Sequence, residues 1–184
     1  MKKLLILLFT PLICLSQGDF RKMNWGESSK ILKEKYSDII FQKEIQGEIT
    51  ILSCEETVSG IQTTVAYSFT GDKFFAGVYL FGFDSDSKES IDHLKDFNLV
   101  SARLRNKYQM TREDVWINDD WKDDPNNLPH ALDMTHVSLI EKGANDETLI
   151  VHSLGKENGE LIHRLIYTSE NMMNKIQDSM NDDF

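Results

Sequence analysis

Cysteine is nearly absent from this chain of 184 residues, which contains only Cys14 and Cys54. We expect Cys14 to be lost with a removable leader, so the mature chain would form no intrachain disulfide. The fold would then rest on its core, although the leader directs it to an oxidising compartment. Cys54 lies in a strand-like stretch, where a buried, inert thiol is expected. Ten Phe, five Tyr and three Trp supply the core, because aromatic side chains bury large areas.

Established catalytic motifs are also missing. The sequence has no Gly-x-Ser-x-Gly elbow, no phosphate-binding Gly-rich loop and no His-Glu-x-x-His helix. Ser85 and Lys88 match the spacing of a serine acyl-transfer motif, but its companion motifs are absent. These absences favour a protein that works by binding, with no cofactor, over an enzyme.

Basic residues are few, since 20 Lys and Arg stand against 30 Asp and Glu and the formal net charge is −10. Loss of Lys2 and Lys3 with the leader would take this charge to −12. Such a surface repels nucleic acid and anionic lipid, both of which bind through clustered Lys and Arg. We therefore expect no nucleic-acid partner.

No apolar run is long enough to span a membrane. Residues 4–15 are largely apolar, whereas a membrane span needs about 20 such residues. Two lysines before this run and small residues after it are typical of a signal peptide over residues 1–16. We expect export to the periplasm or cell exterior, with no transmembrane segment in the mature chain. A lipid anchor at Cys14 is the alternative, although Ile13 is larger than the residue that normally precedes a lipidated cysteine.

The stretch 49–83 predicts an antiparallel sheet. Val65, Tyr67 and Phe69 alternate with smaller or polar residues, as in a strand with two unlike faces. Residues 74–83 are almost all apolar, as in a strand covered on both faces. Further strands are predicted over 135–141, 148–154 and 160–168.

Helices accompany these strands. Apolar residues recur at helical spacing from about 86 to 108, and Asp86 or Ser87 would cap this long helix. We expect it to cross one sheet face and give strand 74–83 its second cover. Ser169 would cap a C-terminal helix that carries an apolar side made of Met172, Met173, Ile176 and Met180.

Strands grouped in runs, rather than alternating singly with helices, indicate the α+β class. We interpret residues 17–184 as a single domain. Its order of helix and then antiparallel meander repeats coarsely in the halves 19–84 and 86–180.

The chain contains several short signatures, namely Asp19-Phe20-Arg21 with Trp25-Gly26, Tyr67-x-Phe69, Tyr79-x-Phe81, Leu104 to Tyr108, and Trp116-x-Asn118-Asp119. Together they resemble a family of small, uncharacterised bacterial proteins that are secreted or lipid-anchored. Gln109 and Met110 depart from the family pattern, in which Gly and then Pro follow the Lys-Tyr pair. The resemblance implies export and this kind of fold, and it transfers no catalytic or ligand residues.

Three histidines fall on successive predicted strands. If His136 paired opposite His152, and His152 opposite His163, their imidazoles would form a row able to bind zinc or copper. A slip of one residue would turn a histidine to the other face. Surface histidines, or core histidines held by hydrogen bonds, are the alternative.

The segment 111–130 is polar, acidic and rich in turns, and long loops in compact domains often carry function. Its carboxylates suit calcium but lack the spacing of an EF-hand, so a solvated acidic loop is the alternative. An exposed tryptophan there would hold a partner protein or a sugar ring by stacking. The candidate binding residues are Trp116, Asp119, Asp120, Trp121, Asp123 and Asp124.

The sequence therefore favours an exported α+β protein that acts without catalysis, as a binding or accessory module of the periplasm or cell exterior. Its partner would be an unknown protein or small ligand. One alternative is a small extracytoplasmic enzyme or metal-binding protein that uses the strand histidines. Another is a structural component of the cell envelope.

Overall fold

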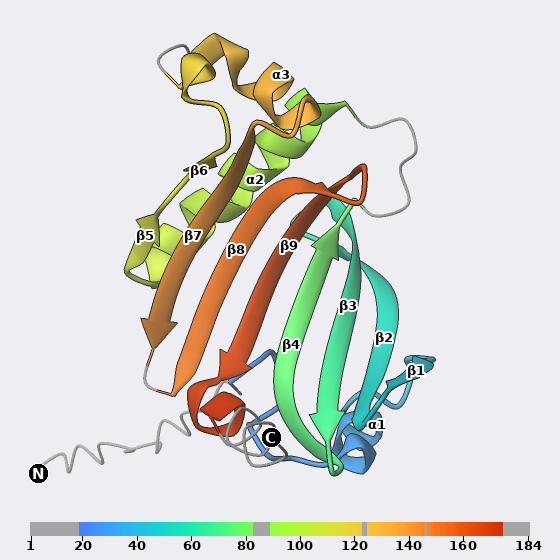
Figure 1. The fold of residues 1–184 in the computed structure, drawn as a ribbon. Helices are drawn as coiled ribbons and strands as arrows, with labels where there is room; N and C mark the ends of the chain where they lie inside the picture. Colours follow the sequence, from blue (N-terminus) through green and yellow to red (C-terminus); the bar gives the residue numbers. More distant parts are fainter. Residues whose placement is uncertain (1–18, 83–88, 123–124, 146, 175–184) are drawn as a thin grey trace, which may run out of the picture.

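The computed structural model describes residues 19–82, 89–122, 125–145 and 147–174, whose strands form a nine-stranded antiparallel sheet (Figure 1). The order across the sheet is β1-β2-β3-β4-β9-β8-β7-β5, and β6 pairs with β7. The predicted α+β class is confirmed. The strands are β1 (Gln42–Gln46), β2 (Ile49–Val58), β3 (Ile61–Thr70), β4 (Lys73–Phe81), β5 (Met110–Arg112), β6 (Val115–Trp116), β7 (Val137–Asn145), β8 (Thr148–Glu157) and β9 (Glu160–Ser169).

The long helix is confirmed as α2 (Ser90–Lys107), whereas the expected caps Asp86 and Ser87 lie outside the described residues. The Met172 N–H donates to Ser169 Oγ at 3.3 Å, so Ser169 does cap the helical residues 170–174. The remaining helices are α1 (Ser29–Lys35), α3 (Leu128–Asp133) and the 3-10 turns η1 (Asp119–Trp121) and η2 (Pro125–Asn127). No helix among the described residues is long and apolar enough to cross a membrane.

Each half of the chain contributes a meander to the sheet. Strands β1 to β4 come from the first half and β7 to β9 from the second, and the two meanders join where β4 pairs with β9. A helix precedes each meander, but β5, β6 and α3 intervene between α2 and β7. The predicted helix-then-meander order therefore holds only in part.

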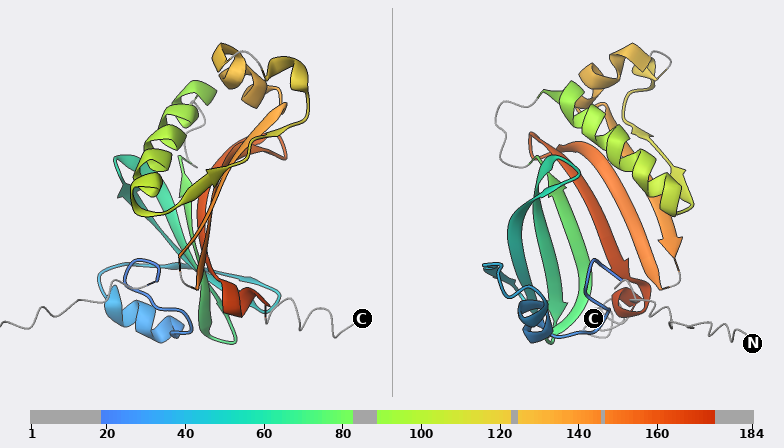
Figure 2. Two further views of the ribbon diagram at one scale, coloured as in Figure 1. Left: turned by 90° about the vertical axis from the view of Figure 1, so that its left-hand side faces the viewer. Right: turned by 180° about the vertical axis from the view of Figure 1, so that it is seen from behind.

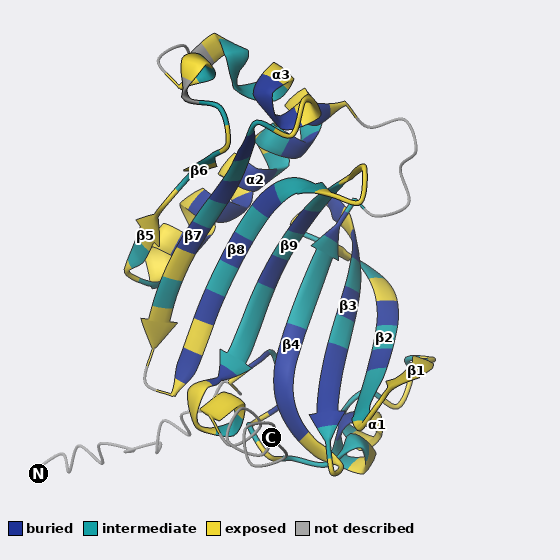
Figure 3. Ribbon diagram, viewed as in Figure 1, coloured by how far each residue is buried: buried dark blue, intermediate teal, exposed yellow. Residues whose placement is uncertain are grey.

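One face of the sheet is covered by the helices. Strand register places Val65, Tyr79, Leu165, His152 and Glu141 in a row across five strands, from β3 to β7. All of these side chains are buried except that of Tyr79, which is half-buried. Burial alternates with the pleat, as the dark bands along β7, β8 and β9 show (Figure 3).

The prediction that the long helix covers the second face of strand 74–83 is wrong. Helices α1 and α2 lie on the same side of the sheet (Figure 2), so α2 does not cover the opposite face of β4. Val78 and Leu80 point to that opposite face and are half-buried. The nearly continuous apolar run arises because one face holds Phe and Tyr while the other holds smaller aliphatic residues.

The N-terminal segment covers the β3–β4 part of this face. Phe20 is 2% exposed, and its ring centroid lies 5.4 Å from that of Tyr67, 5.1 Å from that of Tyr79 and 5.5 Å from that of Tyr167. Gly77 makes this approach possible, because a Cβ there would lie 2.3 Å from Phe20 Cδ1. The aromatic stretch 49–83 is thus partly core, with Tyr79 at the margin.

Candidate functional site

Two of the three candidate histidines come together under α2. His152 Nε2 lies 2.9 Å from His163 Nε2, and His152 Nδ1 lies 3.1 Å from Glu141 Oε2. A carboxylate accepts only, so His152 carries its proton on Nδ1 and its Nε2 accepts from the His163 Nε2–H. The result is a directed chain of hydrogen bonds, Glu141–His152–His163.

The third histidine is elsewhere. The register places Glu141 rather than His136 opposite His152, and Leu165 rather than His163 on its other side, so the pairing that a row of three imidazoles would require does not form. His136 precedes β7, and its ring centroid lies 5.7 Å from that of Trp121. Among the described residues no group of three or more His, Cys, Asp or Glu is placed to hold a metal ion.

Helix α2 closes the Glu141–His152–His163 chain from above. The Phe97 ring stacks on His152 at 4.1 Å between centroids, and Ser101 Oγ lies 3.4 Å from His152 Nδ1. Arg105, half exposed, donates to Glu141. Glu141 and His152 are 0% exposed and His163 is 2% exposed, so a substrate does not reach them in this conformation.

Burial and pairing set the charges in this cluster. Burial lowers the pKa of His152 to about 4, although the Glu141 carboxylate opposes the shift. Burial would raise the pKa of Glu141, but hydrogen bonds from Ser101 and His152, together with the charge of Arg105, outweigh it and hold this pKa below its usual value. Near neutral pH the cluster therefore holds a carboxylate, a neutral imidazole and the Arg105 cation.

The acidic loop is more structured than the sequence predicts, because β5, β6, η1, η2 and α3 occupy most of it. Trp116 and Trp121 are half-buried and pack against the core around Phe97 and Leu132, so neither is presented as an exposed stacking platform. Asp120 is exposed, and its N–H binds Asn118 Oδ1 at 3.0 Å. Asp119 begins η1, and Asp123 and Asp124 lie outside the described residues, so a calcium site in this loop stays a prediction.

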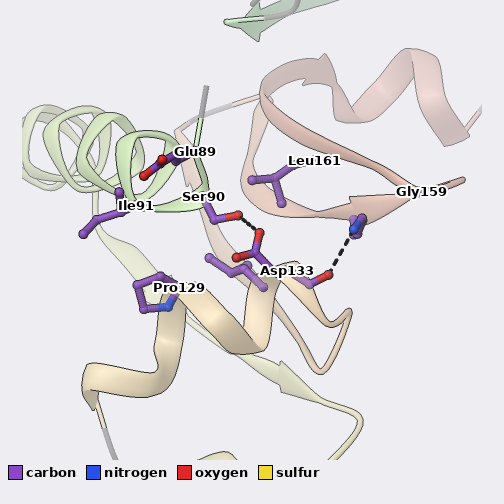
Figure 4. A pocket seen from close by; sticks show the side chains of 9 residues that line it. Glu89, Ser90, Ile91, Pro129, Asp133, Gly159 and Leu161 are labelled. Atoms are coloured by element: carbon purple, nitrogen blue, oxygen red, sulfur yellow. Dashed lines mark hydrogen bonds between the residues drawn. The ribbon is translucent and has the colours of Figure 1, made fainter. Parts of the chain in front are cut away.

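A cavity of about 620 Å³ lies between the start of α2 and α3 (Figure 4). Three of its polar residues bind one another, because the Ser90 hydroxyl donates to the Asp133 carboxylate and Lys156 Nζ donates to the Asp133 carbonyl at 3.0 Å. Glu89 also lines the cavity. The apolar part of its lining includes Ile91 and Leu161. These mutual contacts link α2, α3 and β8.

A second hollow of about 210 Å³ lies on the other flank of α2, between the helix and the strands β4 and β9. We name it the aromatic groove. Its floor consists of side chains at alternate positions on two paired strands, Tyr79 and Phe81 on β4 and Leu165 and Tyr167 on β9. The Tyr79 and Phe81 rings stack with 5.9 Å between centroids and 11° between planes.

Helix α2 forms one wall of the aromatic groove and the β2–β3 hairpin forms its end. Val100 and Leu104 face the groove from α2, with Arg103 and Lys107 at its edge. Val58 and Ser59 line it from the hairpin, so the walls come from segments far apart in the chain. The sequence signal for this groove was the Tyr-x-Phe of β4 beside the Leu-x-Tyr of β9, but only strand pairing brings them together.

Comparison with protein-family models, curated protein sequences and solved structures finds no match. The resemblance drawn from short signatures therefore stays a prediction, and any function has to be argued from the sites themselves.

Proposed function

We propose that this chain is an exported, non-catalytic binding protein whose ligand is a small molecule with an apolar body, held in the aromatic groove. The observation that carries the proposal is a hollow with a four-residue apolar and aromatic floor on rigid strands. Ligand sites are typically concave and mostly apolar, with a few polar groups at defined places. At about 210 Å³ the groove is smaller than the roughly 300–1,000 Å³ of drug-sized sites, so it suits a single unbranched alkyl chain or a single ring.

The alternative of an enzyme based on the strand histidines has less support. The Glu141–His152–His163 chain has the order of a catalytic relay, but its members bond to one another and are sealed by Phe97. A buried network of this kind rigidifies and specifies a core. We assign it to the positioning of α2 over the sheet.

Calorimetric titration with decanol tests the proposed site. We expect saturable binding at one site in the wild type and none in Val58→Trp, whose indole would fill the end of the groove. Val115→Trp is the matched control, because Val115 is exposed on β6 and does not line the groove. Binding that survives Val58→Trp, or no binding to the wild type, would refute the proposed site.

Export is tested separately by the intact mass of protein recovered from the periplasm and medium. The proposal predicts a chain that has lost residues 1–16. A chain that begins at a lipid-modified Cys14 would show a membrane-anchored protein, and a full-length cytoplasmic chain would contradict export.

A further inference from the structure

The charges at the aromatic groove are of one sign. Its lining, taken over the described residues, includes Arg103 and Lys107 but no Asp or Glu. The chain as a whole has the opposite balance, with 30 acidic and 20 basic residues. The nearby Arg21 is paired with Glu56 at 2.7 Å, so that pair adds little net charge. The groove thus combines an apolar floor with a cationic edge.

The two cations are positioned by the fold. Arg103 and Lys107 are four residues apart on α2, which places them on one side of the helix. Arg103 also donates to Ser59 Oγ across the end of the groove. Ser59 and Gly60 have φ values of 61° and 85°, as in the tight two-residue turn of a β-hairpin, so this anchor is fixed by the backbone. A guanidinium has five N–H donors, so the bond to Ser59 leaves capacity for a carboxylate.

The tyrosines of the groove supply further donors. Burial raises the pKa of Tyr79 to about 12, and burial together with neighbouring Tyr108 raises the pKa of Tyr167. Both hydroxyls are therefore protonated at neutral pH and able to donate a hydrogen bond. Lys107 Nζ lies 5.0 Å from the centre of the Tyr108 ring, which also lines the groove.

The geometry points to an amphipathic monocarboxylate as the ligand class, with a single apolar chain or ring on the aromatic floor and its carboxylate at Arg103 and Lys107. This inference rests on the proposed function and adds to it the charge of the ligand. Charge complementarity carries it, because a neutral apolar ligand would leave two cations beside an apolar hollow without using them. Charge-assisted hydrogen bonds to a carboxylate are about twice as strong as neutral ones.

Paired titrations with decanoate and decanol, which share the same alkyl chain, test this inference. In the wild type we expect decanoate to bind about three- to tenfold more tightly than decanol at low salt. The advantage of decanoate should shrink as salt is added, because exposed charges are screened. In the double variant Arg103→Gln/Lys107→Gln the two ligands should bind equally, because the preference for decanoate is lost.

The control is Lys95→Gln, which removes an exposed α2 cation that does not line the groove. Decanoate affinity should be unchanged in this variant. Equal binding of decanoate and decanol to the wild type would overturn the carboxylate inference and leave the proposed function standing. Failure of both ligands to bind would overturn the proposed function itself. An equal loss of decanoate binding in Lys95→Gln would also overturn the inference, since it would show a general charge effect.

Discussion

Arg105 and Arg103 lie two positions apart on α2 and belong to opposite flanks of the helix. Arg105 binds Glu141 above the buried His152, whereas Arg103 binds Ser59 at the edge of an open groove. We call the Arg105 side of α2 the closed flank and the Arg103 side the open flank. On the closed flank the Phe97 ring stacks on the His152 ring, with 4.1 Å between their centroids, and fills the space over it. On the open flank the helix offers the smaller Val100 and Leu104, and a hollow of about 210 Å³ remains.

This difference shows that burial of polar groups and availability for binding are separate properties. On the closed flank Arg105, Glu141, His152 and His163 are linked by hydrogen bonds, and the cluster stabilises the docking of α2. On the open flank the cations are at the surface and contribute little to stability. The variants below should therefore affect stability on the closed flank and ligand binding on the open flank.

The largest expected effect comes from Glu141→Ala. It removes the acceptor of His152 and the partner of Arg105 from a fully buried position. Breaking a buried pair by removing one member costs roughly 3–5 kcal/mol of unfolding free energy. Urea denaturation measures this loss. The control Glu113→Gln breaks only the exposed pair with Lys142 and should change stability by less than about 1 kcal/mol; a similar loss in both variants would contradict the comparison.

Acid should weaken the closed flank next most strongly. In the unfolded chain His152 binds a proton near its ordinary pKa of 6.5, whereas in the folded state its pKa is about 4. The unfolded state therefore binds more protons between these values, and stability falls by roughly 3 kcal/mol as the pH drops from 6.5 to 4. The lowered pKa of Glu141 acts in the same direction, since its stabilisation is lost when the pH falls through the folded value. Urea denaturation from pH 7 to 4 should show this slope.

The variant His152→Leu should have a flatter pH dependence over the same range. His130→Gln is the control, because His130 is exposed on α3 and outside the cluster. If His152→Leu kept the full slope, the assignment of the acid response to His152 would be wrong.

Replacing the two arginines one at a time should change the unfolding free energy less than Glu141→Ala or acid does. Arg105→Ala leaves the buried Glu141 carboxylate without its cation, so we expect a loss of about 1–3 kcal/mol in unfolding free energy. Arg103→Ala removes only an exposed contact to Ser59 and should cost less than about 1 kcal/mol. Thermal and urea unfolding of both variants measure these losses. Equal losses of unfolding free energy in the two variants would contradict the distinction between the flanks.

The smallest effect on stability is expected for Val100→Phe. The larger side chain would extend into the aromatic groove, so the unfolding free energy should change by less than about 1 kcal/mol while decanol binding is lost. Ala131→Phe is the control, because Ala131 is 0% exposed in the core around Phe97. Overpacking there should cost about 1–3 kcal/mol or more. A comparable loss in Val100→Phe would show that the groove is not an adaptable space.

Much of the fold could be predicted from local patterns. Alternation over 64–69 and the Gly71-Asp72 turn indicated the β3–β4 hairpin, and helical spacing indicated α2. The position of α2 could not be predicted, because apolar stripes show that a helix is covered and do not show by which strands. The N-terminal segment packs over β3 and β4 on the same face as α2 (Figure 2), so α2 gives β4 no second cover.

The sites were harder to predict than the strands. The histidine pairing failed because β7 begins after His136 and the register follows the buried apolar residues Leu139 and Leu154. Strand alternation placed His152 and His163 correctly on strands, but Glu141 gave no signal of its own in an acidic sequence. The aromatic groove requires β4 to pair with β9, a contact between distant segments that no local pattern contains.

The aromatic groove, and not another surface, is the proposed place of the ligand. Methyl-resolved NMR during titration with decanol tests it most directly, because Val58, Val100, Leu104 and Leu165 line the groove and report on it individually. Binding in the groove should give saturable shifts at these methyl groups, with Leu139 and Leu154 of the closed flank unchanged. Shifts confined to other parts of the molecule, or no shifts at saturating decanol, would contradict it.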